Sequence, residues 1–244
     1  MLEEIFSVGL LKIIGVNLVL SGDNAVVIAL AARNLPPKQQ KQAVFIGAGA
    51  AVVLRVILTL VAAALLTLPW IKIAGAILLL WVGLQLLMPE DGHGGEEEEA
   101  ASSMIGAIRT ILIADLVMSL DNVIAVAAAA GDSFALLLIG LGISIPIVIF
   151  ASTFLIKLME RWPIIITIGA ALIGYVAGEM LINDPAIRHW EESAHAFTER
   201  ATGGLLEPGV ICGIIGAVFV VALGTWLGKR KQAKPAEQLK HAEG

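Results

Sequence analysis

Cysteine and charged residues are both scarce in this sequence of 244 residues. The single cysteine, Cys212, excludes disulfides within the chain and any zinc site built on a cysteine cluster. Only 15% of the residues are charged, whereas an ordinary soluble domain has about 25%. The net charge is −5 and the basic residues are scattered among apolar stretches, which argues against a protein that binds nucleic acid.

The sequence also lacks the usual motifs of hydrolytic catalysis. It contains neither a G-x-S-x-G nor an H-E-x-x-H motif, and none of its four histidines lies inside a long apolar run. The motifs and the intramembrane histidine that usually carry nucleophilic or acid–base chemistry are therefore missing. We expect a protein that is not an enzyme.

Apolar residues, in contrast, are abundant. They make up 58% of the chain, and the mean hydropathy is +0.88. A helix needs roughly 20 mostly apolar residues to cross a bilayer. Seven segments have this character, at residues 5–32, 43–66, 69–88, 104–130, 134–156, 164–183 and 207–228. The sequence thus predicts an all-α, polytopic membrane protein with seven transmembrane helices, and the lipid bilayer is its expected partner.

The distribution of basic residues predicts an orientation. With seven crossings, eleven of the sixteen Lys and Arg residues fall on one side, four fall on the other, and Arg55 lies within a segment. Cytoplasmic loops carry the excess of Lys and Arg. We therefore expect a multi-pass protein of the cell (inner) membrane with its N-terminus outside and its C-terminus inside.

A polar linker divides the chain. Residues 89–103 (PEDGHGGEEEEAASS) are acidic and glycine-rich, which predicts an irregular cytoplasmic linker between residues 1–88 and residues 104–183. The role of its His93 stays open. The remaining parts are an extracytoplasmic amphipathic loop, a seventh transmembrane helix and a basic cytoplasmic tail, at residues 184–206, 207–228 and 229–244.

The two halves repeat a motif. Residues 17–24 read NLVLSGDN and residues 115–122 read DLVMSLDN, with five of the eight positions identical. The second segments share IGAG against IGLG, and the third segments align GAILLLWVGLQ with GAALIGYVAGE. Because each half makes three crossings, the second half enters the membrane from the opposite face. The sequence therefore predicts two inverted three-helix repeats plus one extra helix, an arrangement common in secondary transporters.

The repeated motifs place polar groups inside membrane segments. A carboxylate there costs at least about 2.5–3.5 kcal/mol, so intramembrane acids indicate function. Carboxylate, amide and hydroxyl oxygens suit Mg²⁺, Ca²⁺ and Mn²⁺ and disfavour copper(I) or a cysteine-type zinc site. We predict a divalent-cation site at the repeat interface, with ligands drawn from Asp23, Asn24, Asp121, Asn122, Asp115 and Asn17.

Five further residues are expected to support this site, namely Ser21, Ser119, Arg55, Met118 and Glu179. Ser21 and Ser119 share helix faces with the amide and carboxylate candidates. Arg55 either neutralises the carboxylates when no metal is bound or forms a purely structural salt bridge. Met118 is either a soft ligand or a packing residue. Glu179 is either a ligand or proton acceptor near the outer surface or an interfacial glutamate.

The backbone at each Asp–Asn pair affects the geometry. In an unbroken helix, adjacent side chains point about 100° apart. A helix break would bring them together and free backbone carbonyls as ligands. Gly22 favours such a break in the first motif, whereas Leu120 gives no such help in the second.

The paired motifs SGDNAVVIALAARNLP and DLVMSLDNVIAVAAA, with the seven-helix plan and the acidic linker, resemble the TerC family of integral membrane proteins, which is related to the LysE-type exporters. The resemblance implies export of divalent metal ions, chiefly Mn²⁺ as the transported ion, and an association with tellurite resistance. Ca²⁺ and Mg²⁺ also fit the oxygen ligands. The alternative is a membrane scaffold in metal or tellurite stress response with no transport of its own. A homo-oligomer is compatible with either function.

Overall fold

A computed structural model describes residues 15, 22–65, 68–88, 96–130, 134–187, 190, 198 and 206–242. Over these residues the chain forms seven α-helices and one short 3₁₀-helix, and it forms no strand there. The predicted all-α class is confirmed for this part of the chain.

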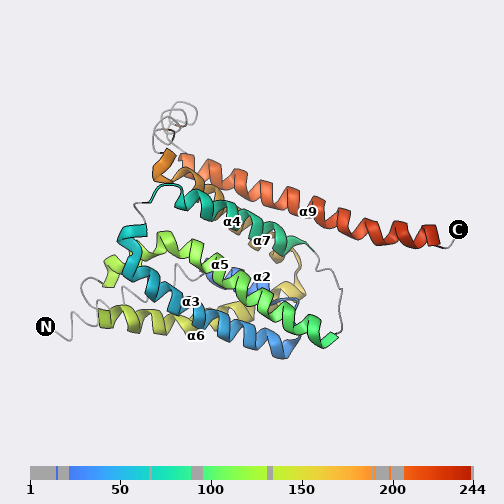
Figure 1. The fold of residues 1–244 in the computed structure, drawn as a ribbon, viewed down its shortest axis with the longest axis horizontal. Coiled ribbons are helices and arrows are strands. Elements are labelled where there is room, and N and C mark those ends of the chain that lie inside the picture. Colours follow the sequence, from blue (N-terminus) through green and yellow to red (C-terminus); the bar gives the residue numbers. More distant parts are fainter. Residues whose placement is uncertain are drawn as a thin grey trace. The chain divides into compact units, whose positions relative to one another are not determined.

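The helices follow the apolar segments of the sequence (Figure 1). In chain order they are α2 (Gly22–Ala32), α3 (Pro37–Leu65), α4 (Ile71–Leu87), α5 (Glu96–Ala130), α6 (Phe134–Arg161), α7 (Ile164–Ile182), η1 (Pro185–Ile187) and α9 (Pro208–Ala242). Proline occupies the first position of α3 and of α9, where its missing N–H removes no helical hydrogen bond. Pro146 lies inside α6, which continues to Arg161.

Within the described part of the chain, five helices contain stretches that are long and apolar enough to cross a membrane. These stretches are Pro37–Val61, Ser103–Leu120, Leu138–Arg161, Ile164–Ile182 and Pro208–Arg230. Two apolar helices are shorter: α4 has 17 residues and the described part of α2 has 11. Most of the first predicted segment, residues 5–21, lies outside the described residues. The chain is an integral membrane protein with several apolar helices.

The helices group into two compact units. The first contains Met1–Ile71 and Gly94–Pro163, and the second contains Lys72–His93 and Ile164–Gly244. The first unit therefore holds α2, α3, α5 and α6, whereas the second holds α4, α7 and α9. Each unit takes helices from both halves of the sequence.

Within the first unit, α3 packs on α5 and α2 packs on α6 (Figure 1). Small residues let the first pair approach closely, because a Cβ atom on Gly47 would lie 2.8 Å from Cδ1 of Ile111. Buried Ile28, Leu30 and Leu141 fill the interior of the unit. Close packing of this kind drives helix association in lipid, where the hydrophobic effect between helices is weak.

Within the second unit, α7 packs extensively against α9. Gly174 and Gly178 are four residues apart on α7, the spacing of a small-xxx-small interface. A Cβ atom on Gly174 would lie 2.5 Å from the carbonyl oxygen of Gly216, and one on Gly178 would overlap the carbonyl of Cys212. The two backbones therefore touch, which only glycine permits at these positions.

Large apolar side chains cover the outward faces of several helices. Phe45, Ile57, Phe150, Phe154 and Phe219 are between 46% and 76% exposed. Such a surface is unusual in a soluble monomer. It fits helices whose outer faces contact lipid.

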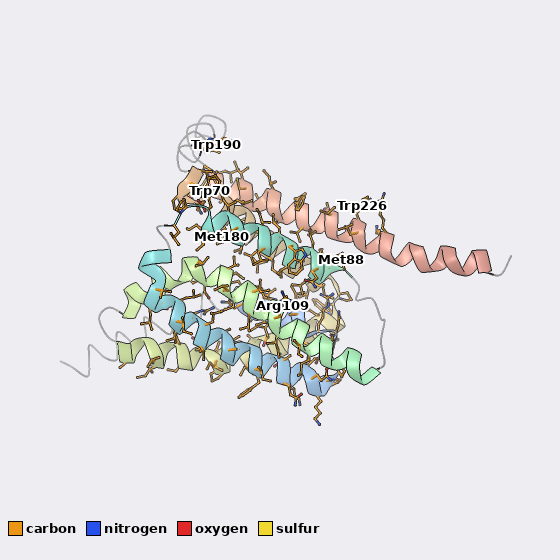
Figure 2. The ribbon with its side chains drawn as sticks, viewed as in Figure 1. Trp70, Met88, Arg109, Met180, Trp190 and Trp226 are labelled. Carbon is orange, nitrogen blue, oxygen red and sulfur yellow. The ribbon has the colours of Figure 1, made fainter. Side chains whose placement is uncertain are left out.

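Tryptophan side chains mark the ends of membrane helices. Trp70 directly precedes α4, Trp162 directly follows α6, and Trp226 lies near the end of the apolar part of α9 (Figure 2). The guanidinium of Arg230 lies 3.8 Å from the centroid of the Trp226 ring. Aromatic and basic residues are enriched at membrane–water interfaces.

Two local expectations need correction. Residues 96–103, expected to be irregular, form the first turns of α5, because glutamate and alanine are strong helix formers and acidic residues are favoured at a helix N-terminus. The basic tail continues α9 as far as Ala242. At Asp121–Asn122, where Leu120 gave no support for a helix break, α5 runs through both residues without interruption. The first motif is described only from Gly22, where α2 begins.

Candidate metal-ion site

A buried ion pair joins two helices of the first unit. Nη2 of Arg55 on α3 lies 2.6 Å from Oδ1 of Asp115 on α5, and the two side chains are only 4% and 6% exposed. Charges this deeply buried are tolerated only when they are paired and hydrogen-bonded. The pairing supports both roles considered for Arg55, since each requires contact with a carboxylate.

Ser119 completes a hydrogen-bonded network with this pair. Nε of Arg55 donates to Oγ of Ser119 at 3.1 Å, and this hydroxyl donates to Oδ2 of Asp115 at 3.3 Å. Asp115 and Ser119 are four residues apart, so they share one face of α5. Ser119 is fully buried. The network therefore fixes the guanidinium on the face of α5 that carries the second motif.

The described part of the first motif lies near this network. Asp23 and Asn24 are in the first turn of α2, and Oδ1 of Asp23 accepts a hydrogen bond from the backbone N–H of Asn24 at 2.7 Å. Asp23 is half-buried, and it is close enough to Arg55 and Asp115 for their charges to act on it. The structure thus brings two of the three predicted carboxylates into one electrostatic cluster.

The second motif is described in part. Met118 is buried, whereas Asn122 is half-buried. Nδ2 of Asn122 is shielded from solvent and has no hydrogen-bond acceptor within the described part of the chain. The backbone of Asp121 belongs to α5, but its side chain lies outside the description. Buried polar groups normally have a hydrogen-bond partner. The described side chains therefore do not satisfy the hydrogen-bonding capacity of the Asn122 amide.

Other predicted site residues are not brought to this cluster. Asn17 and Ser21 lie outside the described residues. Glu179 is exposed on α7, in the second unit. Among the side chains that the structure does describe, no three His, Cys, Asp or Glu residues form a group that could hold a metal ion. The complete ligand set therefore stays a prediction.

The charges in this cluster favour a cation. When ionised, Asp23 and Asp115 carry two negative charges against the single positive charge of Arg55. Charges interact strongly at short range in a medium of low dielectric constant. The cluster contains carboxylate oxygens and the hydroxyl of Ser119, and oxygen atoms are the ligands that hard divalent cations prefer.

One buried carboxylate was not anticipated from the sequence. Asp184 follows α7, is 1% exposed, and accepts backbone hydrogen bonds from the start of α4 and from η1. Its only sequence signal is the Asp–Pro step, which is typical of a turn. Its hydrogen bonds connect the start of α4 and η1 within the second unit.

Comparison with known proteins places these features in a family. The family model for the integral membrane protein TerC family matches residues 2–232. The chain is 44% identical over 183 residues to the uncharacterized membrane protein YjbE of Bacillus subtilis, covering 75% of this chain and 83% of that protein. It is 28% identical over 224 residues to YkoY, an uncharacterized membrane protein of the same organism, covering 84% of this chain and 69% of YkoY. No solved structure matches the chain.

Proposed function

Because this chain belongs to the TerC family of integral membrane proteins, we propose that it exports divalent metal cations, Mn²⁺ first among them, by alternating access. The observation that carries this proposal is the acidic cluster of Asp23, Asp115 and Arg55 inside an apolar helical unit. Intramembrane ionisable residues commonly mark ion pathways, since their burial is otherwise costly.

The proposed ion site lies between the two repeated motifs. Asp23 and Asp121, with Asn24 and Asn122, supply the repeated ligands, and Asp115 adds a third carboxylate from the same helix as Asp121. Three acids against one arginine leave an empty site with net negative charge. A divalent ion relieves this repulsion, and it is the cargo of the protein rather than a resident cofactor.

The arrangement of helices supports an inverted repeat. In the first unit the second helix of one half packs on the first helix of the other half, as α3 does on α5 and α6 does on α2. The third helices of both halves, α4 and α7, belong to the second unit. Secondary transporters built from inverted repeats hold their ions at the repeat interface. In the proposed orientation, the N-terminus is outside the inner membrane and the C-terminus is in the cytoplasm.

Manganese flux tests the proposal. Proteoliposomes containing the purified full chain are loaded with Mn²⁺, and its release is followed for the parent, Asp23→Asn and Asp121→Asn. Each substitution keeps the shape of the side chain and removes one charge, so we expect flux to fall by at least about tenfold, which corresponds to the loss of one charge-assisted contact. Asp115→Asn should have a smaller effect on ion binding, because Asn17 already fills the equivalent position in the other half.

Ser152→Ala is the matched control. The Ser152 hydroxyl is buried in the same unit, but it donates only to carbonyls of its own helix, those of Val148 and Ile149. This variant should transport at the parental rate. If the parent releases no manganese, or if both aspartate variants release it like the parent, the transport proposal is wrong and a scaffold role is favoured.

A further inference from the structure

We propose that Arg55 is a tethered counter-ion. It pairs with Asp115 when the carrier is empty, and the transported ion displaces it from Asp115. This inference rests on the proposed transport function. It assigns Arg55 a specific step, which is to compensate the charge of Asp115 so that the empty carrier can change its orientation. A carrier with an uncompensated buried charge would have to move that charge through the low-dielectric interior, which is costly.

The geometry of Arg55 suits this role. Its guanidinium reaches across from α3 and makes its two described side-chain contacts, with Asp115 and Ser119, on one face of α5. Both contacts cross the interface between α3 and α5, so they depend on how these two helices lie against each other. The Nη2–Oδ1 distance of 2.6 Å shows that the pair is closed in this structure.

A divalent ion and Arg55 compete for the negative charge of Asp115. Asp23 is within electrostatic reach of both Arg55 and Asp115. A cation bound by Asp23 and Asp115 would therefore sit close to the guanidinium, and two cations repel strongly where the dielectric constant is low. The ion-bound cluster and the closed Arg55–Asp115 pair exclude each other for this reason.

Arg55 and Asp115 each correspond to a neutral residue in the other half of the sequence. Asp115 corresponds to Asn17, and extending the alignment of IGAG (46–49) with IGLG (139–142) places Val148 opposite Arg55. Each of these two aligned positions is therefore charged in one half of the sequence and neutral in the other. The extra acid and the extra base occur together, which indicates that they act as one unit added to the repeated Asp–Asn motifs.

The test separates net transport from exchange. Proteoliposomes containing the parent or Arg55→Gln are loaded with radioactive Mn²⁺, and its release is measured with and without Mn²⁺ outside. Exchange needs only the ion-bound carrier to reorient, whereas net release also needs the empty carrier to return. We expect Arg55→Gln to keep exchange and to lose net release by at least about tenfold, the effect of a penalty near 1.4 kcal/mol.

Two further variants refine the test. Arg55→Lys keeps a positive charge and should regain part of the net release that Arg55→Gln loses. The double variant Arg55→Gln/Asp115→Asn removes one charge of each sign and so restores the parental net charge of the site. Its ratio of net release to exchange should therefore exceed that of Arg55→Gln. An unchanged ratio in Arg55→Gln overturns the counter-ion role, as does an equal loss of both rates. Absence of both net release and exchange in the parent instead refutes the proposed transport function.

A measurement on the parent covers the case in which Arg55→Gln fails to fold. Infrared difference spectra are recorded as Mn²⁺ is added to the parent and to Arg55→Lys. Displacement of Arg55 from Asp115 should change the guanidinium stretching bands of the parent, and this change should be missing from Arg55→Lys. If the parental guanidinium bands do not change when Mn²⁺ binds, the guanidinium stays in place and the inference is wrong.

Discussion

Asp184 caps the beginning of α4 from a position 112 residues later in the chain: its Oδ2 accepts the backbone N–H of Lys72 at 3.0 Å. The same oxygen accepts the N–H of Ile73 at 3.1 Å, and Oδ1 accepts that of Ala186 at 2.7 Å. The first N–H groups of a helix have no partner within the helix, so a buried helix start requires such acceptors. One carboxylate thus joins α4, the end of α7 and η1 within the second unit.

Removing this cap should destabilise the second unit. Asp184→Ala leaves buried N–H groups without acceptors, and loss of a cap costs about 0.5–2 kcal/mol. Asp184→Asn keeps one carbonyl acceptor and should lose less. Thermal unfolding of the purified protein in detergent measures both variants. An Asp184→Ala protein as stable as the parent would show that the cap contributes nothing.

The close crossing of α7 and α9 gives a second prediction. Gly178→Ala places a methyl group against the backbone carbonyl of Cys212, so the helices must separate. Overpacking of this kind costs about 1–3 kcal/mol. Gly142→Ala on α6 is the matched control, because a Cβ atom there meets nothing within 4 Å. Thermal unfolding should distinguish the two variants, and equal stability would contradict the tight α7–α9 interface.

The predicted orientation can be tested by labelling. In a Cys212→Ala background, single cysteines at position 102 or 193 replace serines that belong to the predicted linker and the predicted outer loop. A membrane-impermeant thiol reagent applied to intact cells should label the variant Ser193→Cys alone. Ser102→Cys should react only after the membrane is opened. Labelling of both from the outside would refute the seven-crossing topology.

Removal of metal should reveal how strongly the thermal stability of the protein depends on Arg55. Arg55→Ala leaves Asp115 buried without its ion-pair partner, and breaking a buried pair typically costs about 3–5 kcal/mol. In the presence of a chelator, the variant should therefore melt well below the parent. Added Mn²⁺ should restore part of the loss, because a ligand that binds only the folded state stabilises it by mass action. Ser152→Ala should melt like the parent, and an Arg55→Ala protein that also does so would contradict the prediction.

Helix positions were largely predictable because the membrane helices are continuous apolar runs. The ends were harder, since the stretches Glu96–Ser103 and Lys229–Ala242 are polar and carry no apolar signal, although their residues form helix well. The division into two units was not predicted. Sequence similarity identifies the repeats. The grouping of α4 and α7 with α9 depends instead on tertiary contacts, which the similarity does not reveal.

The candidate site was predicted in its residue types but not in its pairing. Motif repetition identified Asp23, Asp115 and Ser119, and the mid-segment position of Arg55 marked it as a partner for an acid. Which acid it meets depends on the rotation of α3 about its axis, which the sequence does not reveal. The capping role of Asp184 was not predicted, because a contact between residues 112 positions apart leaves no periodic pattern in the sequence.

The uninterrupted course of α5 has a mechanical consequence. Its 35 residues form one rod about 52 Å long, at a rise of 1.5 Å per residue. The acidic stretch that begins at Glu96 and the motif residues Asp115 and Asp121 are parts of that same rod, without a hinge between them. If the proposed release of an ion tilts or rotates α5, the glutamates near its N-terminus must therefore move together with the motif residues.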